Sequence, residues 1–172
     1  LLFALPIGLF YGGLSGYIGG KVDFLMMRFA EIMMSFPQFY LLLALAAILP
    51  PQIDSRMRLI LIIIILALIG WAPLARVIRG MILSYKNEEY IQAAQTIGVS
   101  TPVIIWKHLL PQTSSFIIIS ITLGVPGYLL AESGLSFLGL GIQPPAASWG
   151  NLLQEAQNLA NILDRPMLFV AP

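Results

Sequence analysis

Apolar residues gather in four long stretches of the chain, with polar and charged residues between them. The stretches cover residues 1–20, 26–49, 59–75 and 115–132. Each is close to the roughly 20 residues that a helix needs to cross about 30 Å of hydrocarbon, and the shortest must include flanking residues to do so. The pattern therefore predicts an all-α fold, a polytopic bundle of transmembrane helices that forms a single domain over residues 1–172.

Proline interrupts or closes three of these stretches, at Pro37, Pro73 and Pro126. Such residues are tolerated in a membrane helix only where neighbouring helices, side chains or water satisfy the freed backbone groups. They predict breaks in the helices of a packed bundle. Together with the glycines beside Pro126, Glu132 predicts that the last span ends near residue 132 and is followed by an irregular loop.

Glycine recurs at every fourth position of the first stretch, at Gly8, Gly12, Gly16 and Gly20. On a helix these residues form one ridge without side chains, along which a second helix can approach closely. Helix packing is the simpler interpretation of this ridge. A substrate pathway lined by the ridge is the alternative.

The composition agrees with a membrane protein and removes most other classes. Of the 172 residues, 58% are hydrophobic and 10% are charged, against about 25% charged in a soluble domain. The net charge of +1 gives no sign of a nucleic-acid partner. Cysteine is absent and histidine occurs once, which excludes thiolate chemistry and a multi-histidine metal site. We therefore expect no catalytic residues, no metal and no cofactor bound by this chain.

Basic residues orient the predicted spans. With the turn after the first span and the segment after the third placed in the cytoplasm, six basic residues lie inside and three outside, as the positive-inside rule favours. The inner set is Lys21, Arg28, Arg76, Arg79, Lys86 and Lys107, and the outer set is Arg56, Arg58 and Arg165. Residues 84–111 would then be a cytoplasmic segment and residues 133–165 an external loop.

The ends of the chain also carry a prediction. The first residues already lie inside an apolar run, and a new apolar run begins at Met167, shortly before the last residue. We therefore expect these residues to be cut from a larger bundle.

The cytoplasmic segment is predicted to form two short helices joined by a glycine turn. Asn87 is suited to cap the first helix, and Gly98 lies where a left-handed C-terminal cap is expected. Tyr90, Ala94 and Ile97 would share one face of this helix.

The second short helix is predicted to begin at Thr101-Pro102, with Thr101 as its cap and Pro102 at its first position, and to end at Leu110-Pro111. It carries Ile, Val and Trp side chains that so short an element cannot bury alone. Two interpretations stay open: the segment docks on a partner protein, or it lies on the lipid headgroups.

Two carboxylates within the apolar stretches need an explanation. Glu132 is a candidate for a pathway or gate, because a carboxylate in a span usually faces protein or water. The simpler interpretation places it near the outer interface, hydrogen-bonded to a bend at Ser133-Gly134. Glu31 is three residues after Arg28, so we expect an ordinary ion pair on one helix.

The cytoplasmic segment resembles the EAA motif of ABC importer permeases. The matching residues are Gln92, Ala93 and Ala94, then Gly98 after three positions, then His108, Leu109, Leu110 and Pro111 after nine more. A second block resembles the C-type permease subunit of dipeptide, oligopeptide and nickel importers. It runs from Gly134 to Gly141 and continues through Gln143-Pro144-Pro145 and Ser148-Trp149-Gly150. Shorter matches, such as Gly70-Trp71 and Ala75-Arg76, extend the resemblance over nearly the whole chain.

The resemblance implies a type I ABC importer permease of a bacterial or archaeal cytoplasmic (inner) membrane, which carries peptides, nickel or related small solutes. It implies that the EAA segment is a coupling helix that sits in a groove of a cytoplasmic ATPase subunit. The partners would be a second homologous permease, two ATPase subunits that bind ATP with magnesium, an extracytoplasmic substrate-binding protein and the lipid bilayer. The chain itself would be no enzyme, and it contains no phosphate-binding Gly-x-x-x-x-Gly-Lys-Ser/Thr sequence.

The sequence departs from the family pattern at Gln92, where the motif has glutamate. The amide keeps the length of the side chain and loses its charge.

Two other classes of function remain as alternatives. A channel or secondary transporter working without ATP would need ion-coupling residues in the spans, where only Glu132 is available. A membrane-embedded enzyme would need clustered His, Asp or Ser within the spans, and the sequence has no such cluster.

Overall fold

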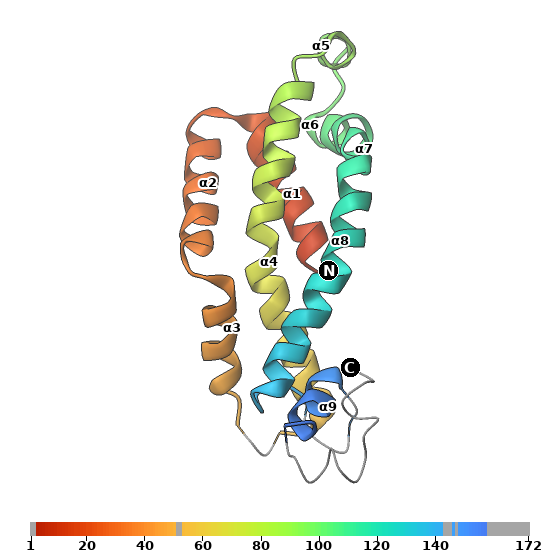
Figure 1. Cartoon of the computed structure of the whole chain (residues 1–172). Coiled ribbons are helices and arrows are strands. Elements are labelled where there is room, and N and C mark those ends of the chain that lie inside the picture. Colours follow the sequence, from red (N-terminus) through yellow and green to blue (C-terminus); the bar gives the residue numbers. More distant parts are fainter. Residues whose placement is uncertain (1–2, 51–52, 143–145, 147, 158–172) are drawn as a thin grey trace. The chain divides into compact units, whose positions relative to one another are not determined.

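The computed structural model describes residues 3–50, 53–142, 146 and 148–157, and within them every regular element is a helix (Figure 1). The elements in chain order are α1 (Ala4–Ile18), α2 (Gly20–Ser35), α3 (Gln38–Ala47), α4 (Ser55–Tyr85), α5 (Glu89–Thr96), α6 (Thr101–Val103), the π-helical stretch η1 (Ile104–Leu109), α7 (Leu110–Gln112), α8 (Ser114–Phe137) and α9 (Trp149–Glu155). The predicted all-α helical bundle is confirmed.

Two helices among the described residues, α4 and α8, are each long and apolar enough to cross a membrane. The pair α2 and α3 provides a third candidate if it counts as one broken span, and α1 is apolar but has only 15 residues. A 31-residue helix such as α4 extends about 46 Å, more than the roughly 30 Å of hydrocarbon. The helix ends at Tyr85, ten residues after the end of the predicted apolar stretch at residue 75.

The turn between α1 and α2 is much tighter than expected. The second span was predicted to begin near residue 26 after a polar loop, but α2 begins at Gly20, directly after Gly19. Gly19 has a φ of 70° and Gly20 a φ of 59°, a left-handed conformation that residues with a side chain rarely adopt. Consecutive glycines thus replace a loop by a reversal of the chain.

The prolines act differently from one another. Pro37 separates α2 from α3, so the predicted break is present there. Pro73 and Pro126 instead lie inside continuous helices. The prediction that the last span ends near Glu132 in an irregular loop is wrong, because α8 continues to Phe137. A proline removes one backbone donor, and a long helix with full turns on both sides can tolerate that loss in a membrane.

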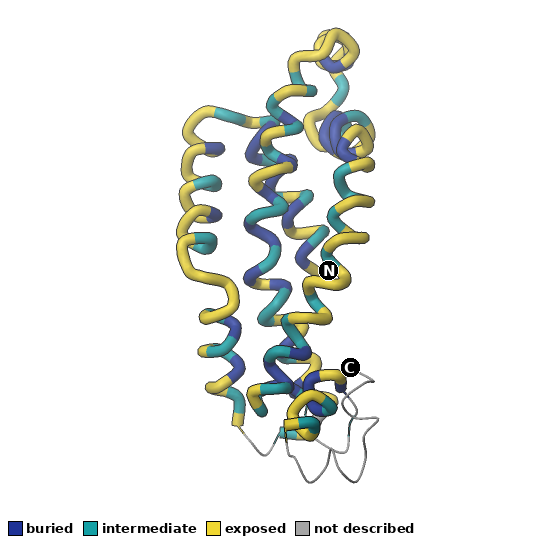
Figure 2. Tube along the Cα trace, in the orientation of Figure 1, coloured by how far each residue is buried: buried dark blue, intermediate teal, exposed yellow. Residues whose placement is uncertain are grey.

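The chain divides into two compact units, which we describe separately. The first contains residues 1–36 and 67–123, and the second contains residues 37–66 and 124–172. The first unit has two buried clusters. One is formed by Ile78 and Ile82 of α4 with residues of α5 and η1, and the other centres on Ala30 of α2 and Trp71 of α4. Figure 2 shows in dark blue where buried positions fall along the trace.

In the second unit, α9 fits closely against the end of α8. A Cβ added at Gly141 or Gly150 would collide with Ser136 of α8, so both positions require glycine for this contact. The Ser148 hydroxyl accepts a hydrogen bond from the Asn151 amide, 3.2 Å away, and so caps α9. Within the external loop predicted over residues 133–165, the first residues still belong to α8, and α9 lies further along.

Candidate functional site

The contact between α1 and α4 has almost no side chain between the two backbones. A Cβ at Gly8 would lie 2.7 Å from the Leu74 side chain, and one at Gly16 would lie 2.8 Å from the Arg79 carbonyl oxygen. At Gly12 an added Cβ would overlap the carbonyl oxygen of Ala75. Gly20 takes no part in this contact: it belongs to α2, and an added Cβ would meet nothing within 4 Å. The ridge is therefore three glycines long.

A polar cluster fastens the α1–α2 turn to α4. The Arg79 guanidinium donates two hydrogen bonds to the Asp23 carboxylate, of 2.8 and 2.5 Å, and Ser15 donates a third to Asp23 at 2.5 Å. The ammonium of Lys86 donates to the carbonyl oxygen of Gly16 at 3.1 Å. Asp23 is buried, so these donors replace its water.

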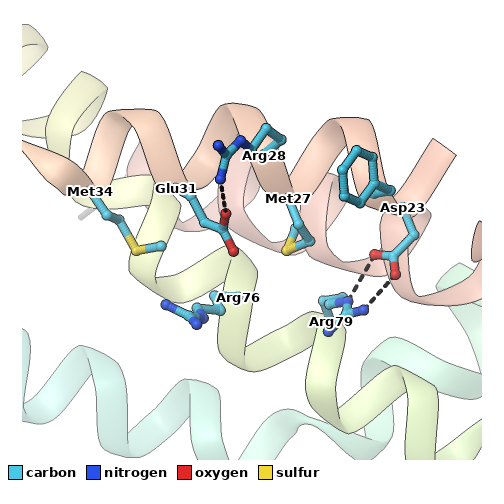
Figure 3. Close-up of a pocket in the computed structure, with 8 residues that line it drawn as sticks. Asp23, Met27, Arg28, Glu31, Met34, Arg76 and Arg79 are labelled. Carbon is cyan, nitrogen blue, oxygen red and sulfur yellow. Dashed lines mark hydrogen bonds and ion pairs between the residues drawn. The ribbon is translucent and has the colours of Figure 1, made fainter. Parts of the chain in front are cut away.

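A cavity of about 270 Å³ opens beside this cluster, between α2 and α4 (Figure 3). It is lined from α2 by Asp23, Phe24, Met27, Arg28, Glu31 and Met34, and from α4 by Arg76 and Arg79. Arg28 and Glu31 form the expected ion pair, with 3.4 Å between Nη1 and Oε2.

The first short helix of residues 84–111, α5 (Glu89–Thr96), stands beyond the C-terminal end of α4 (Figure 1). Ile91 and Ala94 are buried against the end of α4, in the cluster with Ile78 and Ile82. The predicted face of Tyr90, Ala94 and Ile97 is wrong, because the side chain of Ile97 is 80% exposed. Ala94 packs inside as the pattern predicts, but its buried neighbour is Ile91 and not Tyr90.

The turn after α5 is as predicted. Gly98 has a φ of 79°, its amide donates to the Gln95 carbonyl, and the Val99 amide donates to that of Ala94. This pair of hydrogen bonds is the Schellman motif, which needs a left-handed residue at this point. At the other end the N-cap is Glu88, so the prediction of Asn87 is wrong.

The second short helix begins and ends differently from the prediction. Ser100, not Thr101, is the N-cap, and the helix continues through Pro111 to Gln112. Its middle turn is π-helical, an arrangement that occurs often at functional sites and that the sequence did not reveal. Ile104, Ile105 and Leu109 point inward, and Trp106 is 53% exposed.

The residues of the EAA-like motif divide into two groups. Ala94, Leu109 and Leu110 are buried in the first unit, and His108 is half-buried. Gln92, Ala93, Gly98 and Pro111 are exposed. The motif therefore contributes both to the anchoring of the segment and to its outer surface.

Two further hydrogen bonds fix the orientation of α5. The Gln92 amide donates to the carbonyl oxygen of Asn87 at 2.9 Å. The Gln95 amide donates to the Tyr17 hydroxyl at the end of α1, at 3.2 Å. The segment is thus tied to α1 as well as to α4.

At Tyr90 of α5, partial burial and nearby Glu88 raise the pKa of the phenol, so it stays neutral.

Glu132, in the second unit, is held by a neighbour on its own helix. Its Oε1 accepts a hydrogen bond of 2.6 Å from Ser136, whose oxygen also accepts one from the Ile142 amide. The expected partner, a bend at Ser133-Gly134, is absent because α8 is continuous there. A pathway or gate role for Glu132 stays a prediction.

Comparison with known proteins identifies the class. The family model of the binding-protein-dependent transport system inner membrane component matches residues 4–171, so the chain belongs to this family. Its members are inner-membrane components of transport systems, and the curated relatives are named as permeases.

Individual relatives give the subfamily. The chain is 43% identical to the oligopeptide transport system permease protein OppC of Haemophilus influenzae, over 98% of this chain and 52% of the relative. It is 45% identical to the dipeptide transport system permease protein DppC of Bacillus subtilis, over 87% of this chain and 45% of the relative. The oligopeptide transport system permease protein OppC of Escherichia coli is 41% identical, over 89% of this chain and 49% of the relative. The chain thus spans about half the length of the curated relatives it matches.

Three contacts of the site escaped sequence reasoning. The pairs Asp23–Arg79, Gly16–Lys86 and Tyr17–Gln95 join residues 56, 70 and 78 positions apart. The positive-inside rule places Arg79 and Lys86 only on one side of the membrane, and no spacing along one helix shows which acidic or carbonyl group each of them meets. A buried aspartate at the start of an apolar helix is the one available signal, because it requires a donor from elsewhere.

Proposed function

We propose that this chain is part of the membrane permease subunit of an ATP-driven ABC importer for peptides or related small solutes. Residues 84–111 couple it to a cytoplasmic ATPase subunit. The names of its relatives as oligopeptide and dipeptide transport permeases support the substrate class. A second permease, two ATPase subunits that bind ATP with magnesium and an extracytoplasmic binding protein complete the proposed assembly.

One observation carries the coupling role: α5 is anchored on one side and uncovered on the other. Ile91 and Ala94 fix it to the end of α4, while Tyr90 is 43% exposed and Ile97, the C-cap residue of the helix, is 80% exposed. An exposed apolar side chain on a firmly held helix is suited to a pocket on a partner protein. The charged face of an amphipathic helix at the lipid surface is not the pattern here, because no lysine or arginine lies on α5.

The contacts behind α5 offer a route for its movement. Force on α5 reaches α4 through Ile91 and Ala94, and reaches α1 through Gln95 and Tyr17. The glycine ridge then holds α1 and α4 together, so that the two move as one body. Rigid-body motion of packed helices is the usual way in which transporters alternate their access.

The test is co-purification of the full-length permease with its ATPase subunit. Ile97→Asp should reduce the recovered ATPase at least tenfold, because it places a carboxylate in an apolar contact. Met57→Asp is the matched control: it makes the same change at a residue that is 52% exposed at the opposite end of α4. Unchanged recovery with Ile97→Asp, while the protein remains folded in the membrane, would overturn the proposed coupling role.

A further inference from the structure

The cavity between α2 and α4 has an unbalanced charge. Five charged residues line it, and four of them form the two ion pairs Asp23–Arg79 and Arg28–Glu31 (Figure 3). Arg76 lies one helical turn before Arg79 on α4, and it has no hydrogen bond or ion pair within the part of the chain that the structure describes. One positive charge therefore faces the cavity without an anion.

The two arginines on the α4 side of the cavity have more N–H donors than the carboxylates of the cavity accept. Arginine has five N–H donors, and Arg79 uses one from Nε and one from Nη2 on Asp23. Its remaining donors, and all five of Arg76, are available on one side of a cavity of about 270 Å³. Two guanidinium groups one helical turn apart suit a multidentate oxyanion such as a phosphate.

The α2 side of the cavity adds apolar surface. Phe24 is 69% exposed, and Met27 and Met34 lie along the same lining. The α4 side of the cavity begins at Arg76, directly after the apolar stretch of residues 59–75. A basic residue that directly follows an apolar run lies toward the membrane interface, where helix-lined basic pockets bind anionic headgroups.

We propose that this cavity binds the headgroup phosphate of an anionic phospholipid. Arg76 is the principal ligand, Arg79 contributes its free N–H groups, and Phe24 and Met27 contact the glycerol and upper acyl chain. Arg79 keeps its bond to Asp23 while the lipid is bound, so the lipid bridges α2 and α4 at the place where the ion pair already joins them. The inward orientation predicted from the basic residues assigns the site to the cytoplasmic leaflet.

The test is native mass spectrometry of the complete, full-length transporter with added phosphatidylglycerol or phosphatidylcholine of the same acyl chains. Phosphatidylglycerol should bind more tightly, and Arg76→Gln should weaken its binding about fivefold, the contribution of one basic residue near an anionic surface. Phosphatidylcholine carries the same phosphate but no net charge, so its binding should be weaker from the start and should fall less. Arg56→Gln, which removes the same charge from an exposed position at the other end of α4, should leave both lipids unaffected.

Other outcomes would overturn the proposal. Equal binding of the two lipids by the unchanged protein would do so, as would an equal effect of the Arg56 and Arg76 variants. Displacement of phosphatidylglycerol by millimolar inorganic phosphate would make the cavity a site for free phosphate, and cross-linking from position 76 to a neighbouring subunit would make the occupant a protein. Arg76→Lys guards against misfolding: it keeps the charge and must keep the preference for phosphatidylglycerol. The readout is lipid binding, so it does not depend on the proposed transport function.

Discussion

The glycine ridge and the outer face of α5 belong to the same unit of the molecule, yet they are built in opposite ways. Along the ridge, two backbones approach so closely that one methyl group at Gly12 or Gly16 has no room. At the end of α5, the side chain of the C-cap residue Ile97 is 80% exposed, although Ile91 and Ala94 of the same helix are buried. The close contact along the ridge holds α1 and α4 together. The exposed apolar residues at α5 are instead suited to bind a partner protein.

The ridge should be the more sensitive of the two regions. Gly12→Leu is expected to lower the free energy of unfolding by about 3 kcal/mol, because the larger side chain must push α1 away from α4. Thermal unfolding of the full-length permease in detergent measures this change. Gly80→Ala, on the exposed side of α4 where an added Cβ meets nothing within 4 Å, should be neutral or slightly stabilising. Equal stability of Gly12→Leu and the unchanged protein would show that α1 does not pack on α4 as described.

The two ion pairs of the α2–α4 cavity should differ in strength. Asp23→Asn is expected to cost about 2 kcal/mol, because it leaves the partly buried Arg79 without its carboxylate. Glu31→Gln should cost at most about 0.5 kcal/mol, because the side chains of Arg28 and Glu31 are 68% and 46% exposed. The same unfolding assay compares the variants. If the two cost the same, the Asp23 pair does not fasten the turn to α4.

A smaller effect than that of Asp23→Asn is expected on α5. Gln92→Glu removes the amide that donates to the Asn87 carbonyl, and a carboxylate cannot donate in its place. The exposed bond is worth about 1 kcal/mol, so the amides of α5 should exchange with solvent about fivefold faster. Hydrogen exchange with mass spectrometry measures this rate. Gln112→Glu, an exposed residue outside α5, is the control and should leave the exchange of α5 unchanged. Slower exchange in Gln92→Glu would show that glutamate suits this position better than the native residue.

Local chemistry allowed much of the fold to be predicted. The apolar stretches gave the helical membrane bundle, Pro37 gave the break between α2 and α3, and Gly98 gave the left-handed turn after α5. Each of these signals acts within a few residues of its own position. Helix ends were less reliable: α4 and α8 continue through polar residues, since packing and not hydropathy decides where a helix stops.

The site could be predicted only in part, because its geometry depends on which helices meet. The four-residue spacing identified the ridge, but the chain reversal that excludes Gly20 from it depends on the backbone of Gly19. The pairing of Asp23 with Arg79 joins two helices and leaves no trace in the spacing along either. On α5, the end of α4 selects Ile91 for the interior, whereas the pattern of the short helix alone favoured Tyr90.

The central claim is that the outer face of α5 contacts an ATPase subunit. Photo-cross-linking in the assembled, full-length transporter tests it most directly, with the reactive side chain at Ile97 or at Ile48. These residues are 80% and 75% exposed, so they present the probe equally, and Ile48 lies at the end of α3 in the second unit. We predict that the probe at Ile97 captures the ATPase subunit and that the probe at Ile48 does not. Capture of lipid alone from position 97 would contradict the account and would place α5 on the membrane surface.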